Sequence, residues 1–179
     1  MNKSIKAAQG GFTLIELIVV IVILGILAAT ALPKFASLSG EARLASLNAA
    51  KGSLSATSAM THGKWLVTPG GSANITVEGT AVAMNASSGY PSTANANQAR
   101  ALAAAAGLST NDYTVYTTGG SGTRPTVVAG QFAVVPNSII NTATAAKCFV
   151  LYTSSTTANT PPTITVGSPT NPTAVKDCE

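Results

Sequence analysis

The sequence predicts an α+β protein in which one long N-terminal helix packs on a small antiparallel sheet. Three observations support this fold class. An apolar run covers residues 12–32, apolar positions recur at spacings of three and four after Pro33, and short β-prone runs separated by turn signals fill the second half. At 179 residues the chain is long enough for one domain with an appendage, whereas two domains would be crowded.

Composition and charge limit the classes of function. Apolar residues make up 46% of the chain and charged residues only 9%, and Thr, Ser, Asn, Gly and Ala dominate the remainder. This mixture suits exposed strands and loops outside the cell. The net charge of +4 comes from 10 basic and 6 acidic side chains that are spread thinly, without a Lys/Arg cluster. Nucleic-acid binding is therefore not indicated.

The apolar run at the N-terminus is long enough to cross a bilayer. It has roughly 21 residues, which as a helix would span about 30 Å. The polar residues 1–11 before it contain Lys3 and Lys6, which favour a cytoplasmic location for this end and translocation of the rest. In an ordinary secretory signal the small residues of the cleavage site follow the apolar stretch, but here Gly10 and Gly11 precede it. Cleavage at that point would remove the leader and keep the helix in the mature protein.

The stretch "GGFTLIELIVVIVILGILAATALPKF", residues 10–35, resembles the start of a type IV prepilin. The resemblance implies that Gly11 precedes the scissile bond and that Phe12 becomes an N-methylated mature N-terminus. Glu16 then falls at the fifth mature position, where the family has a Glu. It also implies a prepilin peptidase and pilus assembly machinery as partners.

The resemblance continues beyond the cleavage motif. Gly25 and Pro33 fall where such pilins have a helix-weakening Gly and a Pro. The stretch "KFASLSGEARLASLNAAKGSL" is most similar to the mannose-sensitive haemagglutinin pilin branch. Beyond about residue 65 only the general plan of the family is similar, including a C-terminal cysteine pair.

Glu16 is a carboxylate within an apolar segment and so needs a compensating partner. Its insertion into hydrocarbon costs on the order of 2.5 to 3.5 kcal/mol, and less near the interface. After cleavage the α-amine of Phe12 could pair with Glu16 in the same chain, one helical turn away. The amine of a docked neighbouring chain could do so instead, which would set the axial register of assembly. The alternative is that Glu16 only favours the helix N-terminus through the macrodipole.

The helix is predicted to continue past the membrane segment, from about Thr13 to about Met60. Pro33 predicts a kink near residues 29–32, and Gly25 adds a second weak point that costs about 1 kcal/mol relative to Ala. Two stripes follow at helical spacing, and either could be ordinary core packing. One is rich in small residues and suits neighbouring helices, whereas the other suits a globular domain. The first comprises Phe35, Leu38, Ala42, Ala45 and Ala49, and the second Leu44, Leu47, Lys51 and Leu54.

Residues 63–179 are predicted to form a small α+β head, after a cleaved leader at 1–11, an assembly helix at 12–32 and an amphipathic continuation at 33–62. The chain is expected to leave the long helix through Gly63. Asn95 is a candidate N-cap of a short second helix, with Gly107 as its C′ residue. Strands are expected at 113–118, 131–136 and 147–153, with a weaker fourth at 163–167.

The only cysteines are Cys148 and Cys178. An even pair predicts one disulfide in an oxidising compartment if the protein is exported, and the resemblance implies the same disulfide-bounded C-terminal region, 148–178. The bridge would close a loop of about 30 residues and contribute about 3 to 4 kcal/mol. The alternative is two unpaired buried thiols.

The sequence indicates no catalytic, cofactor-binding or metal-binding residues. The single histidine, His62, is expected to cap carbonyls at the helix end or to face solvent. The six acidic residues are scattered and show no paired-carboxylate or calcium-loop spacing. The Gly-rich residues 117–125 lack the lysine of a phosphate loop and predict a hairpin or surface loop.

We therefore interpret the chain as a structural subunit and not an enzyme. The leading hypothesis is a type IV pilin that polymerises as a homo-oligomeric helical filament, or fimbrium, for adhesion or motility. Its precursor would lie in the inner membrane, and the pilus on the surface of a Gram-negative bacterium. One alternative is a pseudopilin or minor pilin of a type II secretion or DNA-uptake system. Another is a membrane-tethered periplasmic binding domain that never polymerises.

Overall fold

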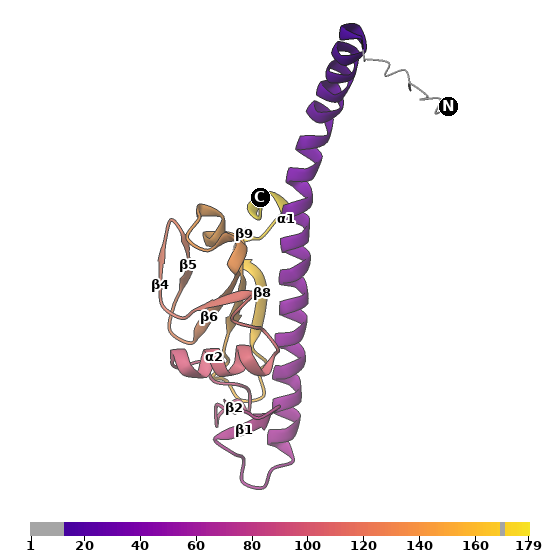
Figure 1. Cartoon of the computed structure of the whole chain (residues 1–179). Coiled ribbons are helices and arrows are strands. Elements are labelled where there is room, and N and C mark those ends of the chain that lie inside the picture. The colour runs from indigo at the N-terminus through magenta and orange to yellow at the C-terminus, as the bar shows by residue number, and fades with distance from the viewer. Residues whose placement is uncertain (1–12, 169–170) are drawn as a thin grey trace, which may run out of the picture. The chain divides into compact units, whose positions relative to one another are not determined.

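The computed structural model describes residues 13–168 and 171–179. It divides into two compact units, Met1–Ala36 and Ser37–Glu179, and each is described by itself. A long helix, α1, is followed in the second unit by short strands and a second helix, α2 (Figure 1). The long helix and the antiparallel sheets confirm the predicted α+β class.

Helix α1 spans Leu14–Leu66 and includes both Gly25 and Pro33. The prediction that it ends near Met60 and leaves through Gly63 is wrong. The last turn of α1 packs against Gly89 through the Trp65 side chain. The two residues are so close that a Cβ added to Gly89 would lie 2.7 Å from the indole ring. This tertiary contact extends the helix past Gly63, whose local helix propensity is poor.

Five antiparallel strands form the main sheet, in the order β3-β6-β7-β8-β9. Their bounds are Tyr113–Tyr116, Gln131–Pro136, Val150–Thr153, Thr163–Ser168 and Asn171–Pro172. Strand β7 is central: Val150 pairs with Val134 of β6 on one side and with Val166 of β8 on the other. All four predicted strand regions therefore belong to one sheet.

In the part of the chain that the structure describes, two hairpins lie outside the main sheet. The first joins β1 (Asn74–Val77) to β2 (Thr80–Ala83) through Glu78 and Gly79, both with positive φ, which is typical of a two-residue hairpin turn. The second joins β4 (Gly119–Ser121) to β5 (Arg124–Val127). It occupies the Gly-rich segment for which the sequence predicts a hairpin or surface loop.

Helix α2 (Ala96–Ala105) has the predicted caps. The Asn95 side chain accepts a hydrogen bond from the backbone N–H of Gln98 at 3.0 Å, and Gly107 has a φ of +74°. The described residues also include three short 3₁₀ helices, at Asn137–Ile139 (η1), Ala143–Ala146 (η2) and Val175–Asp177 (η3).

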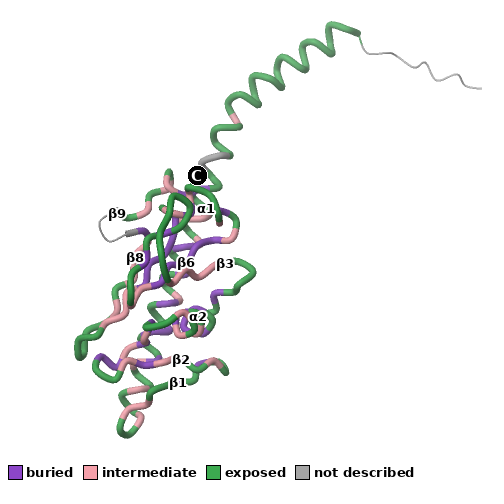
Figure 2. Tube along the Cα trace, turned by 90° about the vertical axis from the view of Figure 1, so that its left-hand side faces the viewer, coloured by how far each residue is buried: buried purple, intermediate pink, exposed green. Residues whose placement is uncertain are grey.

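The core joins the second half of α1 and the main sheet, and it also includes buried residues of α2 and of the β1–β2 hairpin (Figure 2). Leu47 and Leu54 of α1 are fully buried, as are Phe132 of β6 and Tyr152 of β7. The Phe132 and Tyr152 rings stack with centroids 5.1 Å apart. Strand β7 is buried on both faces because α1 covers one side of the sheet and the loops and hairpins cover the other.

The buried Tyr152 predicts that stability falls at alkaline pH. Burial raises the pKa of its phenol, whose O–H donates to the Pro91 carbonyl at 3.3 Å. Above about pH 10 the unfolded chain loses this proton while the folded chain keeps it, so the free energy of unfolding should fall by up to about 1.4 kcal/mol per pH unit. Urea unfolding of the full chain in detergent, followed by Trp65 fluorescence, should show a weaker pH slope in Tyr152→Phe. The half-buried Tyr116, replaced by Phe, is the control, and an unchanged slope in Tyr152→Phe would contradict the assignment.

Candidate assembly interface

The start of α1 is closed by a capping box between Thr13 and Glu16. A Glu16 Oε2 atom accepts hydrogen bonds from the Thr13 backbone N–H and from the Thr13 hydroxyl, both at 2.8 Å. In return the Glu16 N–H donates to Thr13 Oγ1 at 3.3 Å. This reciprocal pattern satisfies donors that helix geometry leaves unpaired at an N-terminus.

The capping box gives Glu16 a partner, Thr13, that differs from the partners predicted above. The T-x-x-E pattern of residues 13–16 is a known sequence signal for such a box and could have revealed it. The other proposed partner, the amine of Phe12, and the proposed cleavage point after Gly11 lie outside the described residues.

The apolar part of α1 has no protein covering it within the described residues. Every large apolar side chain from Leu14 to Leu32 is exposed, with exposed fractions that range from 46% at Ile18 to 75% at Leu14 (Figure 2). By length and composition this segment could cross a membrane. Leaving so large an apolar surface in water is unfavourable, so lipid or other protein must cover it.

The second half of α1 has two contrasting faces. The face against the sheet contains the fully buried Leu47 and Leu54, with Leu44 half-buried and Lys51 exposed. The opposite face is exposed and has only Ala or Gly at positions separated alternately by three and four residues. These are Ala42, Ala45, Ala49, Gly52, Ala56, Ala59 and Gly63. This arrangement agrees with the two predicted stripes except at Lys51, which belongs to the second stripe but is exposed. The Ala/Gly face leaves the helix backbone open to close approach.

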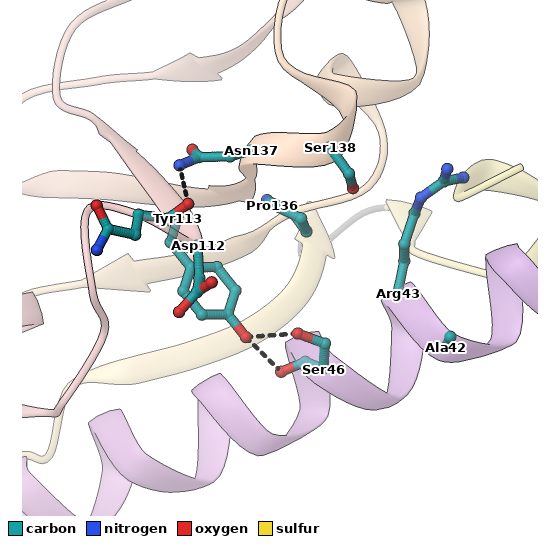
Figure 3. A pocket seen from close by; sticks show the side chains of 9 residues that line it. Ala42, Arg43, Ser46, Asp112, Tyr113, Pro136, Asn137 and Ser138 are labelled. Carbon is teal, nitrogen blue, oxygen red and sulfur yellow. Dashed lines mark hydrogen bonds between the residues drawn. The ribbon is translucent and has the colours of Figure 1, made fainter.

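A groove of 520 Å³ lies beside this exposed face, between α1, the turn before β3 and the end of β6 (Figure 3). At its base the Tyr113 hydroxyl and Ser46 Oγ are 2.5 Å apart, and the same hydroxyl is 3.4 Å from the Ser46 carbonyl. On the far side, Asn137 donates to the carbonyls of Thr110 and Asn111. The Tyr113 bonds join the edge strand β3 to α1, and the Asn137 bonds join the end of β6 to the turn before β3.

His62 has a structural position that differs from the predicted one. It lies within α1 instead of at the helix end, because the helix continues to Leu66. Its Nδ1 is 2.7 Å from the Gly89 carbonyl, and its ring stacks on Tyr90 with centroids 3.9 Å apart. His62 therefore joins α1 to the loop after β2 and does not cap its own helix.

The disulfide expected between Cys148 and Cys178 is present, and both cysteines are fully buried. Cys148 lies between η2 and β7, and Cys178 directly follows η3. The bond therefore ties the C-terminal segment to the residues that lead into the central strand β7.

Comparison with known proteins matches residues 6–32 to a family model described as the prokaryotic N-terminal methylation motif. No solved structure matches the chain. The matched residues include the Gly11–Phe12 junction, the capping box and the exposed apolar helix. The chain thus carries a type IV pilin-like prepilin leader, which fits a type IV pilin or pseudopilin and indicates a structural subunit.

Proposed function

We propose that the chain is the structural subunit of a type IV pilus, which polymerises through its N-terminal helix into an extracellular filament for adhesion or motility. The observation that supports this most directly is the exposed apolar helix surface from Leu14 to Leu32, which immediately follows the methylation motif. Lipid of the inner membrane covers this surface in the monomer. Helices of neighbouring copies replace the lipid in the filament.

The two faces of the second half of α1 support the same proposal. Because the buried face already packs on the sheet, the Ala/Gly face remains for other copies. Small side chains let helix backbones approach closely, which increases the van der Waals contact between them. Gly25 and Pro33 are proposed as weak points where α1 adjusts its course during assembly.

In this proposal a prepilin peptidase cleaves between Gly11 and Phe12, and Phe12 is then N-methylated. Glu16 exchanges its local partner Thr13 for the N-terminal amine of a docked neighbour. The similarity of residues 34–54 to the mannose-sensitive haemagglutinin pilin branch supports a place in that branch and in a Gram-negative bacterium. A pseudopilin or minor pilin of a type II secretion or DNA-uptake system is the second candidate, because the motif at residues 6–32 fits both groups.

The mature chain is expected to begin at N-methylated Phe12. Filaments sheared from the cell surface should contain this chain as the main protein, and mass spectrometry of its N-terminal peptide should show Phe12 with one methyl group. A chain that begins elsewhere would contradict the cleavage assignment. If the chain is processed at Phe12 but is absent from sheared filaments, its assignment as the major pilin would be contradicted. The assignment as a pseudopilin or minor pilin would then be favoured.

A further inference from the structure

The last seven residues, Thr173–Glu179, form a segment that we call the strap. It contains η3, whose first turn is closed by Asp177 Oδ2 accepting from the Ala174 N–H at 2.9 Å. The strap lies across α1 at Gly40 and includes one half of the disulfide, Cys178. All of these residues belong to the second compact unit.

Gly40 provides the space in which the strap lies on the helix. A Cβ at this buried position would be 2.8 Å from Glu179 Cγ and 2.9 Å from the Val175 carbonyl oxygen. Gly in the middle of a helix is less favourable than Ala by roughly 0.5 to 1 kcal/mol. At Gly52 on the same helix, no described atom outside the local helix backbone lies within 4 Å of the corresponding Cβ. Close approach of the strap thus explains the glycine at position 40.

Arg43 holds the strap one helical turn further on. Its Nη1 donates a hydrogen bond to the carbonyl of Cys178 at 2.5 Å. Figure 3 shows that the Arg43 side chain, which also lines the groove described above, points away from Tyr113. A hydrogen bond from a charged donor is stronger than a neutral one. Arg43 therefore fixes the residue that carries one sulfur of the disulfide.

Two further hydrogen bonds hold the opposite side of the strap. Thr173 Oγ1 donates to the Lys147 carbonyl at 2.6 Å, next to Cys148, and Thr144 Oγ1 donates to the Glu179 carbonyl at 2.9 Å. The strap is thus held to η2 and Lys147 at both of its ends, and to α1 near its C-terminal end. Enclosed in this way, Cys148 and Cys178 each have an exposed fraction of 0%.

We propose that Gly40 and Arg43 are positioning residues for the disulfide: by docking the strap on α1, they set how fast a thiol reductant can open Cys148–Cys178. An external dithiol opens the bond when its thiolate attacks one cysteine sulfur and the other cysteine leaves as a thiolate. The second thiol then displaces the first cysteine, which leaves two protein thiols and the oxidised cyclic dithiol. The first attack needs access to a sulfur atom, so the strap must lift before it.

The test compares rates of reduction by dithiothreitol in the full chain, solubilised in detergent and followed by alkylation and mass spectrometry of Cys148 and Cys178. Gly40→Ala and Arg43→Gln should each speed reduction at least about tenfold, because the first adds a Cβ that clashes with the strap and the second removes a charge-assisted hydrogen bond. The matched controls Gly52→Ala and Lys51→Gln change exposed positions of the same helix and should leave the rate within about twofold of the parent.

Amide hydrogen exchange separates local opening of the strap from general loss of stability. In both variants, exchange should rise in residues 173–179 and stay unchanged at the buried residues Thr57, Ser58 and Thr61 of α1. Arg43→Lys, which keeps the charge, should be reduced at a rate between those of the parent and Arg43→Gln. Reduction of Arg43→Gln at the parental rate would overturn the proposal, even if Gly40→Ala fails to fold. Equal acceleration by Gly52→Ala or Lys51→Gln would also overturn it.

Discussion

Glu16→Ala is expected to leave membrane insertion intact and to abolish filament growth. Removing the charge lowers the cost of placing the segment in lipid, so the amount of membrane-inserted monomer should not fall. In the proposed filament, however, the substitution leaves the N-terminal amine of a neighbour buried without its counter-charge. Breaking a buried ion pair in this way costs roughly 3 to 5 kcal/mol, so filament number should fall by more than about 100-fold. Immunoblots of membranes and counts of sheared filaments measure the two outcomes.

The capping box makes a second pair of variants informative. Glu16→Gln removes the charge but keeps an acceptor that can bond the Thr13 N–H, since a capping box accepts either Glu or Gln. Thr13→Val keeps the charge and removes the hydroxyl that bonds Glu16. If charge pairing drives assembly, Glu16→Gln should fail as completely as Glu16→Ala, whereas Thr13→Val should still form filaments.

Glu41→Ala is the matched control, because Glu41 is an exposed carboxylate further along the same helix. It should form filaments at the parental number and length. Normal filaments from Glu16→Gln would show that the cap, and not the charge, is the required feature. Normal filaments from Glu16→Ala would show that neither is required, which would refute the register hypothesis.

Local sequence signals predicted most of the fold because they depend on neighbouring residues. The Asn95 cap, the Gly107 turn and the four strand regions each follow from such signals, and the structure contains all of them. The end of α1 was predicted wrongly for the opposite reason. Gly63 is a local signal for termination, but the contact of Trp65 with Gly89, far along the chain, keeps the last turn helical.

The same distinction applies to the candidate site. The capping box of Thr13 and Glu16 is local and could have been found in the sequence. The bond from Tyr113 to Ser46 and the bond from Arg43 to Cys178 join residues 67 and 135 positions apart. A single sequence has no signal for such pairs, because any other Ser or Arg at a polar position of the helix would fit the same amphipathic pattern.

Replacing either cysteine by serine is expected to have the second large effect, on the stability of the head and on filament yield. In the chain-entropy model, removing a bridge across 30 residues costs about 3 to 4 kcal/mol. The strap then depends on Gly40, Arg43 and a few hydrogen bonds, and it should open locally before the rest of the head unfolds. Urea unfolding of the full chain in detergent should show the loss, with Cys148→Ser and Cys178→Ser equally affected.

Membrane insertion should persist in both serine variants, because α1 is unchanged. Filament yield should fall, because the opened strap exposes the head to proteolysis and weakens the docking of the head in the filament. Lys176→Gln, an exposed change within the strap, is the control and should match the parent in stability and yield. Peptide mapping without reductant checks the premise, since it should recover Cys148 and Cys178 as one cross-linked pair. Two separately alkylated thiols would refute the pairing. A paired parent whose serine variants keep full stability would show instead that the docking contacts at Gly40 and Arg43 hold the strap without the bond.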